Sequence, residues 1–513
     1  MAFCNAFIAA LFAGPEGRLA PALTISFLVL FSSLTTSSQP ALADLVVINA
    51  SVWTMTKRDS VHQAIAVSGN RILATGTNKQ INPFVGPSTH VIDAHGRLVL
   101  PGFNDAHVHF IAIGNSFSSI DLRNVKNGAE MTERIARYAR YLPKGRWILG
   151  GHFDDKNWEL PDLRSIDAVT PDNPVFIYRV GAESAFANRL VLDLAKLKDG
   201  DVDIGESAAI GPPGVVRGAA LKRIAALVPS NHTTNWREVA ETATNYAASL
   251  GVTSVQDMHS DDSRAIYRDL DRQGKLKTRV YDCLPLRDSS KLKASRLPTD
   301  PGAMVTDGCL KGFSDGDVES KPALRREVTA ADNAGLQIMI HAIGGSANHI
   351  VLDVFEEVAK TNKVRERRFR VEHAHNASEA DLPRFSRSKI IASMQPFLFD
   401  GSRGSRFGTL LKQNALVAFG SDASMVDLNP LLGIHAAVNC GSESLSVYEA
   451  VRAYTVGSAY AQFQEKEKGT IEPGKLADFV ILSDDVFAID RQKIRDVTVI
   501  LTVVNGKVVY QRN

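Results

Sequence analysis

Short apolar runs bounded by turn residues recur along the middle of the chain and alternate with segments of helical periodicity. Such runs predict buried strands, and the amphipathic segments between them predict helices. Eight strand-like runs with intervening helices predict an α/β fold with a parallel sheet, and eight is the strand count of a (β/α)8 TIM-like barrel. An open doubly wound sheet is the alternative, which strand counting alone does not exclude. The eight runs cover residues 103–109, 251–258, 278–285, 308–313, 336–342, 369–374, 390–395 and 415–422, and helical patterns lie at 236–250, 322–334, 348–359 and 379–386.

The two ends of the chain show a different pattern, with short alternating or β-branched runs punctuated by Gly and Asn. This pattern predicts strands. We expect residues 44–100 and 469–513 to form one composite β-sandwich domain that brackets a barrel at 101–468. Residues of about 115–245 form an unusually long connection with strand-like pieces of their own, and we expect an inserted subdomain there.

The first 43 residues resemble a targeting segment rather than part of the fold. Arg18 precedes an apolar run at residues 23–34, and an Ala-x-Ala pattern ends at Ala43. The run is short for a membrane-spanning helix and is typical of a signal peptide. We predict cleavage after Ala43 and a secreted, periplasmic or other extracytoplasmic location. An uncleaved membrane anchor is the alternative, so any membrane contact is expected through this segment alone.

The overall composition excludes several classes of protein. Of 513 residues, 44% are hydrophobic and 22% are charged, which is typical of a globular chain. The net charge of +2 offers no electrostatic basis for nucleic acid as the main partner. The four cysteines lack CxxC spacing, and removal of Cys4 with the signal leaves an odd number, which favours free thiols over a disulfide framework. A homo-oligomer is compatible with this composition.

The most specific chemical feature is the pair His107 and His109 in the first strand-like run. Side chains two residues apart on a strand share a face, so both imidazoles can reach one metal ion. A His-x-His pair alone is weak, because two surface or core histidines are the more common explanation. The pattern becomes more informative at the ends of later runs, which close with His341, His373 and Asp422.

The ends of barrel strands are where functional groups collect, because the loops that follow them build the site. Four histidines and one aspartate there are suitable ligands for a divalent ion, most simply Zn²⁺. Lys311 also lies in an apolar run, where burying an ammonium is costly. It either reaches solvent at an edge or is converted by CO₂ to a carbamate, an anionic ligand able to bridge two metals.

These motifs together resemble the amidohydrolase superfamily, and within it the amidohydrolase 3 group of YtcJ-like and N-substituted formamide deformylase-like proteins. The resemblance implies a metal-bearing (β/α)8 barrel beside a composite β-sandwich. It implies a ligand order of His107 and His109 on strand 1, Lys311 on strand 4, His341 on 5, His373 on 6 and Asp422 on 8. One or two divalent ions, most simply Zn²⁺, and an N6-carboxylysine at Lys311 are implied with it. The matching stretches are 101–110, 310–316, 341–344, 370–374, 391–396, 419–422 and 469–480.

The resemblance implies hydrolysis of a non-peptide C–N bond in a small-molecule amide, formamide or cyclic amide, with Asp422 as the general base. Glu372 is next to a predicted ligand and either supports that ligand or faces outward, and strand alternation favours the outward position. Surrounding residues depart from the family pattern, as in Gly345 where the group usually has Asp. The alternative is therefore a catalytically impaired, amidohydrolase-like binding or signalling protein. The absence of HExxH disfavours a zincin-type protease.

Overall fold

The central sheet of the computed structural model has eight strands: β8 (Phe103–Val108), β14 (Val252–Met258), β15 (Arg279–Pro285), β16 (Val305–Ser314), β17 (Gln337–Ile343), β18 (Arg370–His375), β19 (Ile391–Met394) and β20 (Leu416–Phe419). Every neighbouring pair is parallel. The edge strands approach one another where the Asp422 amide donates to the His107 carbonyl (2.8 Å) and the His109 amide donates to the Ala423 carbonyl (2.6 Å). The sheet is a nearly closed barrel, so the predicted (β/α)8 architecture is confirmed.

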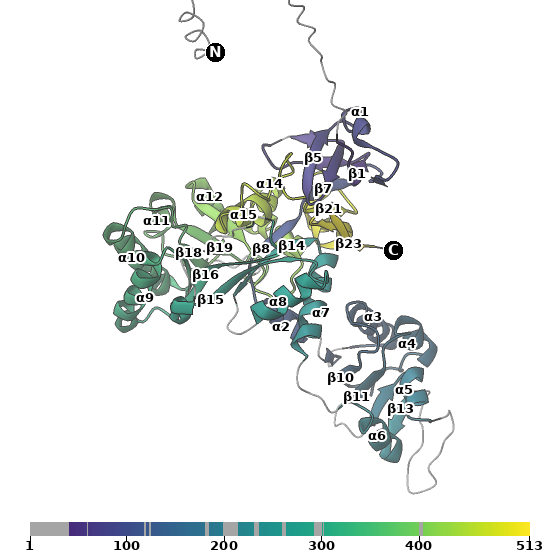
Figure 1. Cartoon of the computed structure of the whole chain (residues 1–513). Helices are drawn as coiled ribbons and strands as arrows, with labels where there is room; N and C mark the ends of the chain where they lie inside the picture. Colours follow the sequence, from purple (N-terminus) through teal and green to yellow (C-terminus); the bar gives the residue numbers. More distant parts are fainter. Residues whose placement is uncertain are drawn as a thin grey trace, which may run out of the picture. The chain divides into compact units, whose positions relative to one another are not determined.

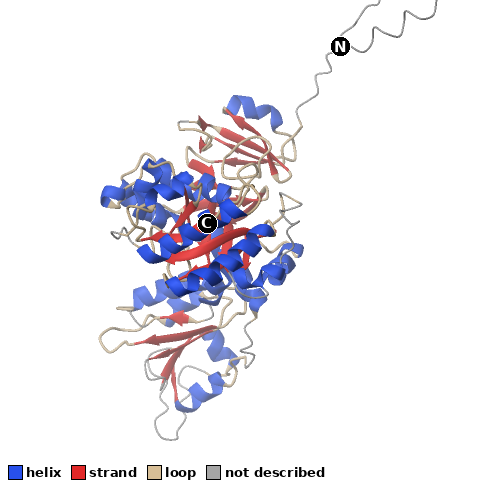
Figure 2. Cartoon of the chain, turned by 90° about the vertical axis from the view of Figure 1, so that its left-hand side faces the viewer, coloured by secondary structure: helices blue, strands red, loops and turns tan. Residues whose placement is uncertain are grey.

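Helices cover the outer face of this barrel (Figures 1 and 2). Outward side chains such as Leu310 and Ile338 share one apolar core with helix residues such as Leu324 and Phe355. The helix predicted from residue 379 begins only at Leu382, because a proline occupies its first turn, where a missing N–H is tolerated. The helices are α2 (Phe110–Ser116), α7 (Trp236–Ser249), α8 (Ser263–Arg272), α9 (Lys321–Asn333), α10 (Gly345–Thr361), α11 (Leu382–Arg387), α12 (Phe407–Lys412), α13 (Pro430–Val438), α14 (Val447–Arg452) and α15 (Ser458–Ala461).

Strands from both ends of the chain pair with each other. One sheet has the order β5-β4-β1-β6, and the other has the order β23-β22-β21-β7-β2-β3 and so combines early and late strands. Apolar side chains from both sheets form one core. The domain boundaries stay a prediction. The strands are β1 (Leu45–Ile48), β2 (Ser51–Trp53), β3 (Val61–His62), β4 (Ala64–Ser68), β5 (Arg71–Gly76), β6 (His90–Asp93), β7 (Leu98–Pro101), β21 (Phe479–Leu482), β22 (Val499–Val504) and β23 (Lys507–Gln511), with α1 (Asn78–Ile81) after β5.

The long connection after β8 contains a third sheet, in the order β13-β12-β11-β10-β9, with an apolar core of its own. A separate core is what an inserted subdomain requires, because each fold unit buries its own apolar face. Its elements are β9 (Ile120–Asp121), α3 (Gly128–Ala139), β10 (Ile148–Phe153), α4 (Leu163–Val169), β11 (Val175–Arg179), β12 (Ser184–Ala187), α5 (Arg189–Leu194), β13 (Val215–Arg217) and α6 (Gly218–Ala225).

The structure describes residues 41–58, 60–116, 119–122, 125–179, 184–197, 214–229, 235–258, 263–291, 300, 302–399 and 404–512. Nearly all of the predicted targeting segment, residues 1–40, lies outside this set. None of the helices in the described ranges combines the length and the apolar character needed to cross a bilayer.

The expectation of free thiols is wrong for two of the cysteines. Cys283 on β15 and Cys309 on β16 form a disulfide, with Cα atoms 4.5 Å apart. The cysteine count could not reveal this pairing, because neighbouring parallel strands bring together two residues that are 26 positions apart in the chain.

A buried lysine should make stability depend on pH. Lys468 is 5% exposed and hydrogen-bonds to the Ser254 hydroxyl. Burial, together with the nearby Arg279 guanidinium, lowers its pKa to about 7, against the opposing effect of Asp478. Between pH 7 and about 10 the unfolded chain binds more protons at this lysine than the native protein, so stability rises with pH through this window.

We expect Lys468→Met to raise the melting temperature at pH 7 by at least about 2 °C. The gain should shrink several-fold by pH 10, where the lysine is neutral in the native protein and has begun to lose its charge in the unfolded chain. Calorimetry across this pH range measures the effect, with Lys466→Met, an exposed lysine two residues away, as the matched control. An equal gain at pH 7 and pH 10 would contradict the explanation.

Candidate metal centre

His107 and His109 project from the carboxyl end of β8 towards Asp422, which follows β20. Their Nε2 atoms lie 3.6 and 3.4 Å from Asp422 Oδ1. Each of the three side chains offers one ligand atom, and these atoms all lie within 4.8 Å of one another. Imidazole nitrogens and a carboxylate oxygen at this separation form a donor set that fits a divalent ion.

Asp422 is held in an uncommon backbone conformation. Its φ is +60°, in the left-handed region that non-glycine residues rarely adopt. Its amide donates to the His107 carbonyl, which ties the residue to the first strand of the barrel. Burial opposes ionisation of its carboxyl, but the hydrogen bond from His109 and the charge of nearby histidines hold its pKa below the ordinary value. The side chain is therefore an anion at neutral pH.

Two further histidines continue the cluster. The His373 ring lies 4.9 Å from the His107 ring, and the His341 ring lies 4.5 Å from His373, measured between centroids. Burial lowers the pKa of His341 to about 4, helped by the charge on Lys311, and that of His373 to about 3, helped by His107. Both are neutral near pH 7, which is the form that binds metals.

Lys311 lies beside this cluster on β16. It is 6% exposed, and its Nζ atom lies 4.0 Å from the centre of the Phe313 ring. Burial lowers its pKa to about 8, although Glu372 and Asp422 oppose the effect. His341, His373 and Lys311 thus lie beside the group of His107, His109 and Asp422, and Lys311 does not point into bulk solvent. That all six hold metal stays a prediction.

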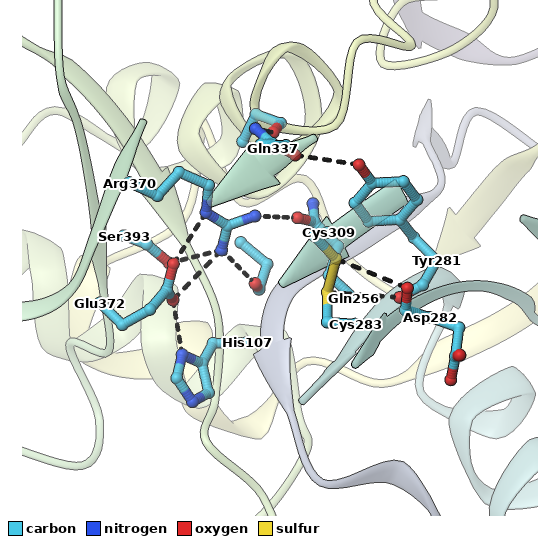
Figure 3. Close-up of a disulfide and its surroundings, with 12 residues drawn as sticks. His107, Gln256, Tyr281, Asp282, Cys283, Cys309, Gln337, Arg370, Glu372 and Ser393 are labelled. Carbon is cyan, nitrogen blue, oxygen red and sulfur yellow. Dashed lines mark hydrogen bonds and ion pairs between the residues drawn. A yellow bond between two sulfur atoms is a disulfide. The ribbon is translucent and has the colours of Figure 1, made fainter. Parts of the chain in front are cut away.

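The prediction that Glu372 faces outward is wrong. Glu372 is fully buried in the barrel interior, and its Oε2 lies 2.5 Å from His107 Nδ1 (Figure 3). On β18 the interior positions are Arg370 and Glu372. Left-handed φ values of +71° at His373 and +47° at Ala374 then break the alternation, so the next histidine also reaches the site.

Arg370 pairs with Glu372 and holds its carboxylate in place. Its guanidinium donates to Glu372 Oε1 (2.8 Å), to the Ala106 carbonyl (2.6 Å) and to Ser393 Oγ (3.0 Å), and it also contacts Gln256 (Figure 3). Burial would raise the pKa of Glu372, but the charge of Arg370 and the His107 hydrogen bond hold it far below its ordinary value. An ionised Glu372 accepts the Nδ1 proton of His107 and leaves Nε2 free for a metal.

Glu372→Gln is therefore expected to weaken zinc binding by about 10- to 100-fold, the range typical of outer hydrogen-bond partners of metal ligands. Chelator competition gives the dissociation constant. Glu379→Gln, on the exposed surface, is the matched control. An unchanged dissociation constant in Glu372→Gln would mean that packing alone orients His107.

Other groups at the site were not singled out by the sequence. Asp105 accepts from the amides of His107 (3.0 Å) and Ser421 (3.0 Å), and burial raises its pKa to about 7. Gln395 lies 2.7 Å from His373 Nδ1. Asp105 could have been found from its position two residues before His107, on the same strand face, whereas no sequence signal marks Gln395.

The spacing of Gly312, Ser314 and Gly316 also matches the G-x-S-x-G pattern of serine hydrolases. In those enzymes the serine occupies a strained turn with an exposed hydroxyl. Ser314 instead lies within β16, is 3% exposed, and does not have a left-handed backbone. This match is incidental.

A nearly closed eight-stranded barrel with histidines and an aspartate at the carboxyl ends of its strands is the architecture of metal-dependent TIM-barrel hydrolases. The chain belongs to the amidohydrolase family, whose family model matches residues 90–510. The resemblance found in the sequence is therefore confirmed.

Several known proteins are similar to this one over nearly the whole chain. The chain is 32% identical to Protein LONG AFTER FAR-RED 3 of Arabidopsis thaliana, over 94% of each chain. It is 28% identical to putative amidohydrolase YtcJ of Bacillus subtilis, over 90% of this chain and 98% of that protein. It is 26% identical to N-substituted formamide deformylase of Arthrobacter pascens, over 91% and 98%.

Solved structures agree with the fold. A metal-dependent hydrolase from Pyrococcus horikoshii is 25% identical, with a TM-score of 0.59 over 87% of this chain and 99% of that one. A zinc complex of atrazine chlorohydrolase from Arthrobacter aurescens is 16% identical, with a TM-score of 0.55 over 91% and 95%, and supports the fold alone.

Proposed function

We propose that this protein is a metal-dependent amidohydrolase that cleaves a non-peptide C–N bond in a small amide, formamide or cyclic amide. The observation that carries this proposal is the convergence of His107, His109 and Asp422, whose ligand atoms lie within 4.8 Å of one another. The match to N-substituted formamide deformylase supports the bond class.

The donor set fits Zn²⁺ best, because imidazole nitrogens and carboxylate oxygens are its common ligands in catalytic sites. His107, His109 and Asp422 would hold one ion, and His341 and His373 would hold a second. Lys311, as N6-carboxylysine, would add an anionic ligand. Its neutral amine attacks CO₂ and loses a proton to leave a carbamate anion, and a pKa of about 8 keeps part of the amine neutral at physiological pH.

The chemistry that a divalent ion supplies when bound is Lewis acidity, which makes water a usable nucleophile near neutral pH. Asp422 accepts the proton of the attacking water at its carboxylate and passes it to the leaving nitrogen when the C–N bond breaks. Glu372 keeps His107 in the tautomer whose Nε2 faces the site.

An extracytoplasmic location belongs to this proposal. The Cys283–Cys309 disulfide supports it, because disulfides persist mainly in oxidising compartments. N-terminal sequencing of the mature protein tests it, with Asp44 as the expected first residue. Retention of residues 1–43 would favour the membrane anchor.

The experiment that tests the function combines metal analysis with a substrate panel. We expect stoichiometric zinc, hydrolysis of at least one class of non-peptide amide, and the mass of one added carboxyl group on the intact folded protein. The mass is measured under native conditions, because a lysine carbamate loses CO₂ once the protein is unfolded and digested. A protein without bound metal or turnover on formamides, linear amides and cyclic amides would contradict the proposal.

The second candidate is a binding or signalling protein that keeps the barrel without turnover. The identity to Protein LONG AFTER FAR-RED 3, whose name denotes no enzymatic reaction, favours it. Bound metal without hydrolysis across the same panel would support this candidate.

A further inference from the structure

Strand β16 contains one extra residue, Gly308, three positions before Lys311. Asp282 of β15 pairs with Asp307, but the next pair is Cys283 with Cys309, so Gly308 has no partner across this ladder. This is a β-bulge, a feature that often lies beside active sites and re-aims the side chains that follow it.

The bulge changes which face Lys311 occupies. Positions 307, 309 and 311 would share one face of a regular strand. Asp307 faces the outer helices, where its Oδ2 pairs with Arg268 (2.9 Å) and Arg264 (3.2 Å) of α8. A regular β16 would therefore turn Lys311 outward as well.

After the bulge, the alternation of side chains between the outer and interior faces of β16 is reversed. Leu310 now packs with the outer helices, in the same core as Leu324. Cys309 faces the barrel interior with Cys283 and Met339, and Lys311 pairs with Met339 in register on that interior face. One inserted residue thus turns Lys311 towards the histidines, since a shift of one position exchanges the two faces of a strand.

The disulfide joins the first residue pair after the bulge (Figure 3). A bulge disrupts the hydrogen-bond ladder locally, so fewer backbone bonds hold the two strands together at that point. The covalent bond from Cys283 to Cys309 fixes β16 against β15 two residues before Lys311. It therefore holds the strand in the one register that points this lysine inward.

The neighbouring tyrosine requires that the inserted residue be glycine. A Cβ on residue 308 would lie 2.4 Å from the Tyr281 hydroxyl oxygen and 2.5 Å from its ring. That ring has little freedom to move, because its hydroxyl donates to Gln337 Oε1 (2.9 Å), and Gln337 in turn donates to the Arg368 and Ala461 carbonyls.

We propose that Gly308 and the Cys283–Cys309 disulfide are positioning residues that aim the Lys311 side chain at the metal centre. The proposal rests on the function proposed above in one respect only, namely that Lys311 serves the metal centre. The geometry of Lys311 can be tested without metal or substrate.

The test compares the full-length protein with a Cys283→Val, Cys309→Ala variant, which removes the disulfide and refills most of its volume. Acetylation of Lys311 by a small acylating reagent is followed by peptide mass spectrometry in metal-free protein, and zinc affinity is measured by chelator competition. We expect acetylation to accelerate several-fold and the zinc dissociation constant to rise about tenfold. Gly308→Ala should change both readouts in the same direction.

Cys440→Ala is the control, because this buried cysteine lies outside the pair and its replacement probes general destabilisation. A disulfide with a merely structural role would lower the melting temperature and leave both Lys311 readouts at wild-type values in the folded variant, which would overturn the proposal. If the wild-type protein binds no zinc, the proposed function fails, while the acetylation rates still decide the positioning role.

Discussion

Replacing Asp422 with asparagine is expected to lower kcat by about 10³-fold, within the range that general acid–base groups contribute. The asparagine keeps the size of the side chain but has no basic oxygen to accept a proton. It also removes the anion from the group formed with His107 and His109. Steady-state kinetics on any substrate found in the amide panel measures the loss.

The control for this variant is Asp427→Asn, which lies five residues further along, where the Asp427 carboxylate accepts a hydrogen bond from Tyr246 (2.8 Å). We expect near wild-type kcat there. Metal content should be measured for both proteins, so that loss of the ion and loss of the base are separated. An Asp422→Asn protein with bound zinc and full activity would remove Asp422 from the mechanism.

Arg370→Leu is expected to destabilise the protein by about 3–5 kcal/mol, because it leaves the buried Glu372 carboxylate without its charge partner. Both side chains are fully buried and are paired at 2.8 Å. The Ala106 carbonyl and Ser393 hydroxyl lose a donor in the same variant. Denaturant unfolding in the absence of metal measures the change.

The double variant Arg370→Leu, Glu372→Leu separates stability from metal binding. Removing both charges should recover much of the stability, since an apolar pair replaces a buried ion pair at little net cost. Zinc affinity should stay low, because His107 no longer has a carboxylate at Nδ1. If affinity returns together with stability, the pair serves the fold and does not orient the ligand.

Much of the fold follows from local sequence. The eight apolar runs correspond to the eight barrel strands, because a strand buried on both faces requires a continuous apolar segment with turn residues on either side. The candidate ligands other than Lys311 could be chosen for a similar local reason, since each stands at or near the end of such a run. Their roles as metal ligands stay a prediction for the metal and activity measurements to decide.

The sequence could not determine which side chains of each strand face the barrel interior. Period-two alternation predicts that Glu372 faces outward, but β18 has Arg370 and Glu372 on its interior face, and left-handed residues at 373 and 374 bring the next histidine inside as well. In β16 the bulge at Gly308 reverses the alternation and turns Lys311 inward.

The apolar pattern and the spacing of His107, His109, His341, His373 and Asp422 thus determined the barrel and named the residues at its rim. Only the tertiary structure decided which of their neighbours support them, and it also paired Cys283 with Cys309. The physical reason is that bulges, ion pairs and disulfides depend on the register between neighbouring strands, which arises from contacts between segments far apart in the chain.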